Sequence, residues 1–397
     1  MALCFGSLPT EADETPEPPT VGRSDAAPRP NVVPRPVIDG TPAETPSPRT
    51  TGWTPRRFTV VGSGDVLLHP GLWRQAQRDA RAAGRFGYDF RPMLAGVAAT
   101  VSAADLAICH LETPLGAPDG PFSGYPIFNV PPQIAPALRE TGYDACSTAS
   151  NHTLDKGEAG IRRTLDALDA AGLRHTGSAR TAAEAAAPTI LDVRGVRVAL
   201  LSYTFSFNGL RRPAGRAWVA NLLDLEAVRA AARRARDAGA EVVILSVHWG
   251  TEYQHAPNAQ QRRLARELLG ASDVELILGH HAHVVQPFER IGGGWVAYGL
   301  GNHLSWQSFS DGTRDGVLAR FTLTETARGR FTVSKAEALP TLMSLDRGPA
   351  RLLEIPTALR QPDLPEWQRR ACQASWRRSA DHLRSRGGSA AGLIVVS

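Results

Sequence analysis

Side chains that can bind a metal ion follow several short apolar runs of this sequence. Each run has the composition of a buried β-strand, and a carboxylate, an amide or an imidazole comes soon after it. In α/β proteins, ligand sites form beyond the carboxyl ends of the strands, so side chains at these positions can meet. A single such residue is commonly structural, but the same pattern after five strands is hard to attribute to chance. The residues concerned are Asp65, Glu112, Asn151, His152, His248, His281, His283, Asn302 and His303.

Each of these residues, taken alone, also has a structural interpretation. Asp65 could cap the helix that follows it, and Asn151 could cap the turn before the next helix. Glu112 could lie on the surface, and His248 could be a hydrogen-bonded core histidine. The two histidines of the 281–283 run are a more specific signal, because two imidazoles on one tight loop can bind one metal ion or two neighbouring ions.

The types of these side chains limit which metal they could bind. A mixed set of carboxylates, an amide and imidazoles suits a hard or borderline divalent cation, such as Mn²⁺, Fe²⁺, Zn²⁺, Mg²⁺ or Ca²⁺. The set contains no thiolate that would select a soft metal. The pattern therefore predicts a divalent metal ion without fixing its identity.

Predicted strands and helices alternate along the chain, which indicates an α/β protein. The apolar runs predict strands at 58–62, 105–109, 143–148, 196–203, 241–247, 274–278 and 295–300. Apolar residues that recur on one helical face predict helices at 157–171, 225–238 and 260–269. Two further runs, 317–323 and 331–338, are typical of an antiparallel hairpin.

Composition divides the chain into three segments. Residues 1–52 hold 11 of the 30 prolines and lack apolar periodicity, so we expect this segment to be disordered. Residues 53–355 carry the predicted strands, and we expect them to form one domain that contains the site. Residues 356–397 contain seven arginines and three acidic residues, and we expect a basic helical tail. Trp367, Cys372 and Trp376 are its candidate docking residues.

Composition and segment lengths also limit the partners. No segment approaches the roughly 20 apolar residues needed to cross a bilayer, and the first nine residues lack the regions of a secretory signal. We therefore expect a cytoplasmic protein without a membrane partner. The basic tail carries no recognition motif that combines aromatic and basic residues, so we expect no nucleic-acid partner.

The four cysteines form no CxxC pair, which excludes a zinc ribbon and a CxxC redox motif. Cys109 and Cys146 lie in apolar runs. We interpret them as two small buried residues.

The order and spacing of these runs, from about residue 57 to residue 323, resemble those of the CapA (poly-γ-glutamate capsule biosynthesis) family. That family is a branch of the calcineurin-like metallophosphoesterases. The resemblance implies an α/β fold with a four-layer α/β/β/α metallophosphoesterase-like sandwich, a C-terminal helical appendage and a site at one edge. The matching runs are Gly64-Asp65-Val66-Leu67-Leu68, Leu111-Glu112-Thr113-Pro114, Ser150-Asn151-His152-Thr153-Leu154-Asp155, Val247-His248-Trp249-Gly250-Thr251-Glu252-Tyr253, the segment 279–287, and Tyr298-Gly299-Leu300-Gly301-Asn302.

The sequence departs from the general metallophosphoesterase pattern at two positions. The usual Asp-x-His run has Leu67 in place of the histidine, and the usual Gly-Asn-His-[Asp/Glu] run has Thr153 in place of the acidic residue. These changes remove potential ligands from a two-metal centre, the arrangement that phosphoester hydrolysis generally uses.

The resemblance implies a metal-dependent enzyme that acts on a peptidic or γ-glutamyl-like substrate. Soluble family members that epimerise lasso-type precursor peptides make inversion of a peptide α-carbon the favoured reaction. A metal ion would then act as a Lewis acid, while one side chain removes the α-proton and another returns a proton to the opposite face. The alternatives are phosphoester hydrolysis and a non-catalytic accessory role in capsule assembly.

The candidate residues divide into two groups, and the oligomeric state and the number of metal ions stay open. The expected metal ligands are Asp65, Glu112, Asn151, His248, His281 and His283. The acid–base candidates are His152, His303, His69 and Asp89.

Overall fold

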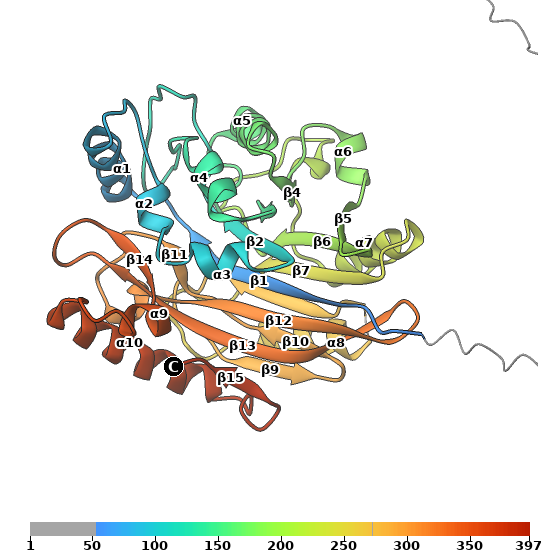
Figure 1. The fold of residues 1–397 in the computed structure, drawn as a ribbon. Helices are drawn as coiled ribbons and strands as arrows, with labels where there is room; N and C mark the ends of the chain where they lie inside the picture. Colours follow the sequence, from blue (N-terminus) through green and yellow to red (C-terminus); the bar gives the residue numbers. More distant parts are fainter. Residues whose placement is uncertain (1–52, 272) are drawn as a thin grey trace, which may run out of the picture. The chain divides into compact units, whose positions relative to one another are not determined.

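Two β-sheets lie face to face, with helices on both outer surfaces (Figure 1). The computed structural model describes residues 53–271 and 273–397. The predicted disorder of residues 1–52 lies outside these described residues. Among them, no helix is long and apolar enough to cross a bilayer.

The first sheet is organised around β1 (Arg57–Val66). Its strand order is β14-β13-β12-β1-β2-β3-β4, with β11 also paired to β1 and β15 to β13. β1 runs parallel to β2 and β11 and antiparallel to β12. The other strands are β2 (Leu106–Leu111), β3 (Ala145–Ser147), β4 (Arg174–Thr176), β11 (Asn302–Leu304), β12 (Asp315–Ala327), β13 (Arg330–Ser344), β14 (Arg351–Glu354) and β15 (Leu393–Val395).

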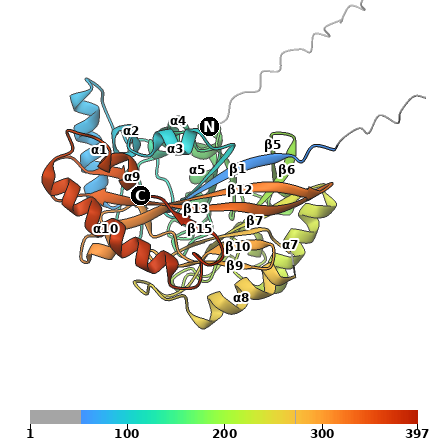
Figure 2. The ribbon, with the colours of Figure 1, turned by 60° about the horizontal axis from the view of Figure 1, so that its bottom comes forward.

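The second sheet has the order β5-β6-β7-β8-β10-β9, and its strands β7, β10 and β9 lie below β12 and β13 in Figure 2. Its central strands β6, β7, β8 and β10 are parallel, so their carboxyl ends lie at one edge. The strands are β5 (Thr189–Val193), β6 (Val196–Thr204), β7 (Val242–His248), β8 (Leu276–His280), β9 (Phe288–Ile291) and β10 (Gly294–Ala297).

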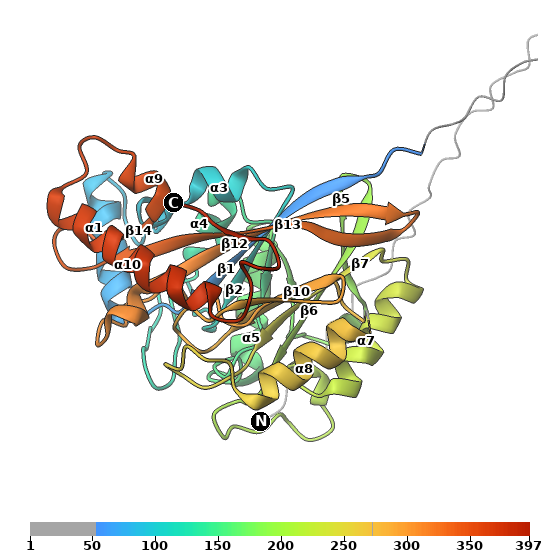
Figure 3. The same ribbon diagram turned by 90° about the horizontal axis from the view of Figure 1, so that it is seen from below.

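Helices α7 and α8 cover the outer face of the second sheet (Figure 3), and the helices from the N-terminal half cover the first. The helices are α1 (Pro70–Ala82), α2 (Arg91–Leu94), α3 (Ala98–Ser102), α4 (Ile134–Thr141), α5 (Gly157–Ala170), α6 (Ala182–Ala186), α7 (Leu225–Asp237), α8 (Ala259–Gly270), α9 (Ile355–Leu359) and α10 (Glu366–Arg384), with short 3-10 turns at Ala217–Val219 and Asp311–Arg314.

Alternating side chains of β1 pack on opposite faces of the first sheet. Phe58 and Val60 pack between the sheets against residues of β6, β7 and β8, while Val61 packs under the helices of the other side. Both faces of the sheet are therefore buried, which explains why the strand reads as a continuous apolar run. The predicted α/β/β/α sandwich is confirmed.

Every predicted strand and helix is present, with end points that shift by a few residues. The predicted hairpin is the antiparallel pair of β12 and β13. The predicted strand 295–300 ends early, at Ala297, because the chain then turns to bond across to the loop after β8, with Leu300 N–H donating to Gly279 O. The short strands β4, β5, β9, β11, β14 and β15 were not predicted, since segments of three to five residues carry little periodicity.

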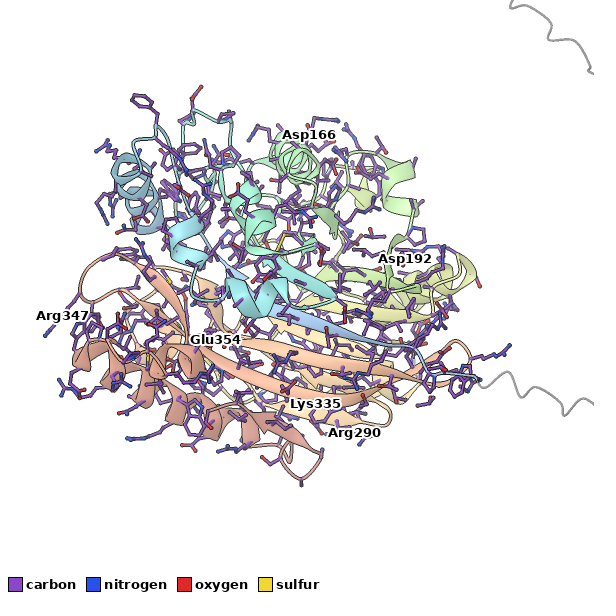
Figure 4. All side chains as sticks on the ribbon, in the orientation of Figure 1. Asp166, Asp192, Arg290, Lys335, Arg347 and Glu354 are labelled. Atoms are coloured by element: carbon purple, nitrogen blue, oxygen red, sulfur yellow. A yellow bond between two sulfur atoms is a disulfide. The ribbon has the colours of Figure 1, made fainter. Side chains whose placement is uncertain are left out.

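The C-terminal segment contains the predicted helix, α10, and a strand that the sequence did not predict. Cys372 is buried, and the indole N–H of Trp376 donates to Val396 O at 2.7 Å. Trp367 is only partly buried, and the guanidinium of Arg347 lies over its ring, 6.0 Å from the ring centre. Figure 4 labels Arg347 at the edge of the molecule, near α10. β15 joins the first sheet by pairing parallel with β13.

The interpretation of Cys109 and Cys146 as separate buried residues was incomplete. Both are buried, but the structure joins them in a disulfide. Parallel pairing of β2 with β3 places the two residues directly opposite each other, with 4.5 Å between their Cα atoms. This register is a tertiary property that the spacing of the cysteines does not reveal.

Candidate metal centre

The predicted ligands converge where strand ends of the two sheets meet. Asp65 lies near the end of β1, Glu112 directly follows β2, and His248 ends β7. Asn151 follows β3, and the 281–283 run directly follows β8. We call the six predicted ligands, Asp65, Glu112, Asn151, His248, His281 and His283, the ligand cluster.

The carboxylate of Asp65 is buried and binds the loop after β8. Its Oδ1 lies 3.2 Å from Nδ1 of His280, and its Oδ2 lies 3.0 Å from Nδ1 of His283. The backbone N–H of His281 also donates to Oδ2 at 3.2 Å. Burial opposes ionisation, but the hydrogen bonds from His280 and His283 lower the pKa of Asp65 well below its usual range. The alternative in which Asp65 caps a helix is wrong, since His69 occupies the position before α1.

Glu112 is the most informative member of the ligand cluster. Its side chain is 1% exposed, and neither carboxylate oxygen has a hydrogen-bond partner among the described residues. Oε1 lies 3.7 Å from Nε2 of His283 and 3.9 Å from Nε2 of His248. Burial raises the pKa of Glu112 well above its usual range. A buried polar group without a hydrogen-bond partner destabilises the fold by about 1–3 kcal/mol, and by more if it is charged. A cation bound between these atoms would remove that penalty.

His248 is oriented by an imidazole that the sequence analysis did not assign to the site. Its Nε2 lies 3.0 Å from Oδ1 of Asn151, on the side that faces Glu112. Its Nδ1 lies 3.0 Å from Nε2 of His110, and the other nitrogen of His110 lies 2.9 Å from Ser147 Oγ. A ring held through one nitrogen presents the other to a metal ion, which is the usual arrangement around metal-binding histidines.

The two histidines of the 281–283 run adopt a backbone conformation that side chains rarely take. The φ angles are +86° for His281 and +54° for His283. Non-glycine residues in such regions cost about 1–3 kcal/mol each and occur preferentially at functional sites. The strained loop brings the ring of His281 to 4.7 Å from that of His248, between ring centres. Nδ1 of His283 also lies 3.1 Å from Oδ1 of Asn302, at the start of β11.

Protonation of the cluster is suited to binding a cation. Burial lowers the pKa of His248 well below its usual range and that of His281 to about 3, so both rings are neutral and can act as ligands. Burial opposes a charge on His283, but the carboxylates of Glu112 and Asp65 raise its pKa to about 9. A metal ion that binds here would displace that proton.

The donor set fits a divalent metal ion. The ligand atoms of Asp65, Glu112 and His283 all lie within 4.8 Å of one another. His248 also adjoins the Glu112 carboxylate, and Asn151 and His281 adjoin His248, so two neighbouring groups of oxygen and nitrogen donors meet at Glu112. This mixed set matches the preference of the hard and borderline cations predicted from the sequence.

A cavity of about 680 Å³ opens beside the ligand cluster and contains two further imidazoles. Its lining includes His283 and Asn151 from the cluster, together with His69 and His152. The rings of His69 and His152 both make edge contacts with Phe128, with ring-centre distances of 5.6 and 4.7 Å. Exposed aromatic side chains, among them Tyr125 and Phe309, form the outer part of the lining.

His152 is paired with a buried carboxylate. Its Nδ1 lies 2.8 Å from Oδ2 of Asp155, whose side chain is inaccessible to solvent. The same oxygen accepts a hydrogen bond from the backbone N–H of Phe128 at 2.7 Å. Asp155 therefore fixes the imidazole by one nitrogen, as in acid–base dyads, and leaves the other for a substrate in the cavity. His69 is held by its Nδ1, which lies 3.1 Å from Leu67 O, and burial lowers its pKa to about 4.

Two predicted acid–base candidates do not join this arrangement. Asp89 forms ion pairs with Arg85 and Arg91 at 3.0 and 2.7 Å and does not line the cavity. His303 alternates with Asn302 along β11, so its ring points to the other side of the strand, where Nε2 lies 2.8 Å from the hydroxyl of Tyr143. Alternation along a strand decides this difference, and it cannot be applied until the strand is located.

Three residues of the site were missed as candidates. His110 and His280 are buried and stacked, with 4.0 Å between ring centres, and each bonds to a predicted ligand. Glu252 lines the cavity, and its carboxylate lies within 4.8 Å of the ligand atoms of His281 and His283. A signal did exist for His110, since it precedes Glu112 by two residues and so lies on the same face of the chain.

Comparisons with known proteins agree with the motifs. A sequence profile described as "Bacterial capsule synthesis protein PGA_cap" matches residues 59–307. Capsule biosynthesis protein CapA of Bacillus anthracis is 29% identical over 192 residues, covering 47% of this chain and 46% of that protein. PGA biosynthesis protein CapA of Bacillus subtilis is 29% identical over 217 residues, covering 53% and 55%. The chain thus spans about half the length of these two relatives.

A probable polyglutamine synthesis accessory protein of Mycobacterium tuberculosis is 28% identical over 292 residues, covering 62% of this chain and 74% of that protein. Among solved structures, the calcineurin-like phosphoesterase YfkN from Bacillus subtilis matches with a TM-score of 0.44 at 15% identity, covering 83% of this chain and 100% of that chain. A phosphatase from Mycoplasma pneumoniae matches with a TM-score of 0.43 at 12% identity, covering 73% and 95%. Since the family profile covers more than half of the chain, including every member of the ligand cluster, this protein belongs to the bacterial capsule synthesis protein PGA_cap family.

Proposed function

We propose that this protein is a divalent-metal-dependent enzyme that moves a proton at the α-carbon of a peptidic or γ-glutamyl substrate. The observation that carries the metal-dependent part is the buried carboxylate of Glu112, which forms no hydrogen bond within the described part of the chain and lies beside the neutral imidazole of His248. The capsule and polyglutamine names of the relatives favour a substrate with peptide or γ-glutamyl linkages. Epimerisation of a residue in a lasso-type precursor peptide is the specific form of this reaction that we favour.

The proposed chemistry divides between the metal ion and the protein. When bound, a divalent cation supplies positive charge that stabilises negative charge developing on a substrate carbonyl group. His152, oriented by Asp155, removes the α-proton through the ring nitrogen that faces the cavity. His69, which lines the same cavity and also contacts Phe128, guides a proton from solvent to the opposite face of the α-carbon, because burial keeps its own imidazole uncharged. Of the four acid–base candidates we therefore favour His152 and His69, because both line the cavity.

Solvent exchange tests this proposal directly. The protein, loaded with Mn²⁺, is incubated in D₂O with a library of short peptides and with γ-linked glutamate oligomers, and the products are analysed by mass spectrometry and chiral amino-acid analysis. We expect uptake of one deuterium at one α-carbon. His152→Gln and Asp155→Asn should lower the rate by about 100-fold or more, since general acid–base catalysis contributes 10²–10⁴-fold. Asp89→Asn, at a carboxylate outside the cavity, is the matched control. Wild-type protein that binds Mn²⁺ but exchanges no α-proton in any of these substrates would contradict the proposal.

Phosphoester hydrolysis is the second candidate, because Glu112 is shared by two neighbouring groups of donors. Two-metal hydrolases hold attacking and leaving oxygens between such paired sites. Release of nitrophenol from p-nitrophenyl phosphate, lost in Asp65→Ala, would establish this reaction. If neither reaction occurs, tight binding of a γ-glutamate oligomer without turnover would support an accessory role in capsule assembly.

A further inference from the structure

The loop after β7 places an acidic side chain beside the ligand cluster. Gly250 and Tyr253 both have positive φ angles, +97° and +62°, so the loop turns sharply after Trp249. The backbone N–H of Tyr253 donates to Ala282 O at 2.8 Å, which joins this loop to the strained 281–283 run. Glu252 lies between the turn at Gly250 and the hydrogen-bonded Tyr253, and it lines the same cavity as His283.

The carboxylate of Glu252 lies at a distance suited to shared coordination. One of its oxygens and one nitrogen each of His281 and His283 all lie within 4.8 Å of one another. Ligands of one cation with bonds near 2.0–2.2 Å are separated by at most about 4.4 Å, so small adjustments would bring the three atoms onto one ion. The side chain of Glu252 is exposed to solvent, so an ion that enters the cavity can reach it.

Leu67 stands at a position where a metal ligand is usual, so the site has room for another ligand such as Glu252. Leu67 lines the cavity with an apolar side chain, at the point where metallophosphoesterases generally have an imidazole. A cation held by Asp65, Glu112 and His283 then has three protein ligands from the buried cluster. A further ligand has to come from water, substrate or a neighbouring loop, and Glu252 is the acidic residue of the cavity lining that shares His283 with this group.

We propose that Glu252 is a direct ligand of the divalent cation at His283 and His281, and that metal binding thereby anchors the 250–257 loop. This inference rests on the metal dependence proposed above but not on the reaction. Coordination by Glu252 would make the 250–257 loop, which is exposed along most of its length, a part of the metal site. The loop also carries Tyr253, whose ring lies 6.1 Å from that of His283 and 4.9 Å from that of Phe309, so anchoring it would also shape the cavity mouth.

Metal titration combined with hydrogen exchange tests this role without measuring turnover. Binding of Mn²⁺ to full-length protein is measured by isothermal titration calorimetry, for wild type, Glu252→Gln and the control Glu226→Gln, an exposed glutamate on α7. We expect Glu252→Gln to weaken Mn²⁺ binding by about 10- to 100-fold, as for groups that support a metal site, and the control to match wild type. Hydrogen–deuterium exchange should show that Mn²⁺ protects the 250–257 loop in wild type and the control but not in Glu252→Gln.

The outcomes separate this inference from the proposed function. If wild type binds Mn²⁺ and Glu252→Gln binds it equally well, with the loop equally protected, Glu252 is not a ligand, while the metal site stands. If wild type binds neither Mn²⁺ nor Zn²⁺, both this inference and the metal-dependent function are overturned.

Discussion

Two buried carboxylates in this molecule have opposite surroundings. Asp315, at the start of β12, accepts hydrogen bonds from Ser375 at 2.6 Å and from Arg378 at 2.9 and 3.0 Å, so both of its oxygens are paired. Glu112 is equally buried, yet the described residues offer neither of its oxygens a hydrogen bond. Its neighbours are imidazoles 3.7 and 3.9 Å away.

The difference separates a structural carboxylate, Asp315, from a candidate metal ligand, Glu112. Asp315 connects the first sheet to α10, and its partners come from that helix. Glu112 does not connect two elements in this way, and the imidazoles around it are suitable ligands for a metal ion. A buried acid with every partner supplied by the protein stabilises the fold, whereas one without partners indicates that a ligand belongs there.

Replacing Glu112 should have the largest effect on metal binding. Glu112→Gln keeps the shape of the side chain but removes the carboxylate charge that lies between His283 and His248. We expect the dissociation constant for Mn²⁺ to rise by more than about 100-fold, exceeding the effect of losing a supporting residue. The melting temperature of the metal-free variant should not fall, because an unpaired carboxylate is removed. A variant that binds Mn²⁺ like wild type would show that Glu112 is not a ligand.

Asp315→Asn should produce the opposite result. The amide cannot accept the fork of bonds from Arg378, and hydrogen bonds to charged groups contribute about 1.5–3 kcal/mol. Because Arg378 is partly exposed, we expect the free energy of unfolding in urea to fall by about 2 kcal/mol. Mn²⁺ affinity measured on the folded variant should be unchanged. A large loss of affinity would mean that the two carboxylates are not independent.

His110→Phe tests whether the residue behind His248 contributes to the site. The ring is preserved in size, but the hydrogen bond to Nδ1 of His248 is lost, so the ligand is no longer held in orientation. We expect Mn²⁺ binding to weaken by about 10-fold, at the lower end for such supporting groups. Circular dichroism must confirm that the variant folds. Ser147→Ala removes the hydrogen bond between Ser147 Oγ and His110, and it should weaken Mn²⁺ binding by less.

Asp89→Asn should have the smallest effect. Its partners Arg85 and Arg91 are exposed to solvent by 54% and 38%, and exposed ion pairs contribute about 1 kcal/mol or less. We expect a correspondingly small fall in the free energy of unfolding and unchanged binding of Mn²⁺. A clear loss of Mn²⁺ affinity would return Asp89 to the site, where the sequence analysis had placed it.

The members of the ligand cluster could be predicted to lie together because each lies in a short motif near the end of a recognisable strand. Asp65, Glu112 and His248 follow apolar runs, and the parallel arrangement of such strands brings their ends together. The acid–base candidates were less predictable. Asp89 and His303 have suitable chemistry, but ion pairing with Arg85 and Arg91 engages the first, and strand alternation directs the second toward Tyr143.

The sequence by itself determined the family, the α/β layering and the six side chains of the ligand cluster, since these depend on local periodicity and on motifs a few residues long. Only the tertiary structure decided which other residues join them. His110, His280 and Glu252 reach the cluster through strand register and through a loop bonded across to Ala282. The same register pairs Cys109 with Cys146. The physical reason is that register and loop contacts depend on residues distant in the chain, whereas periodicity is recorded in each segment separately.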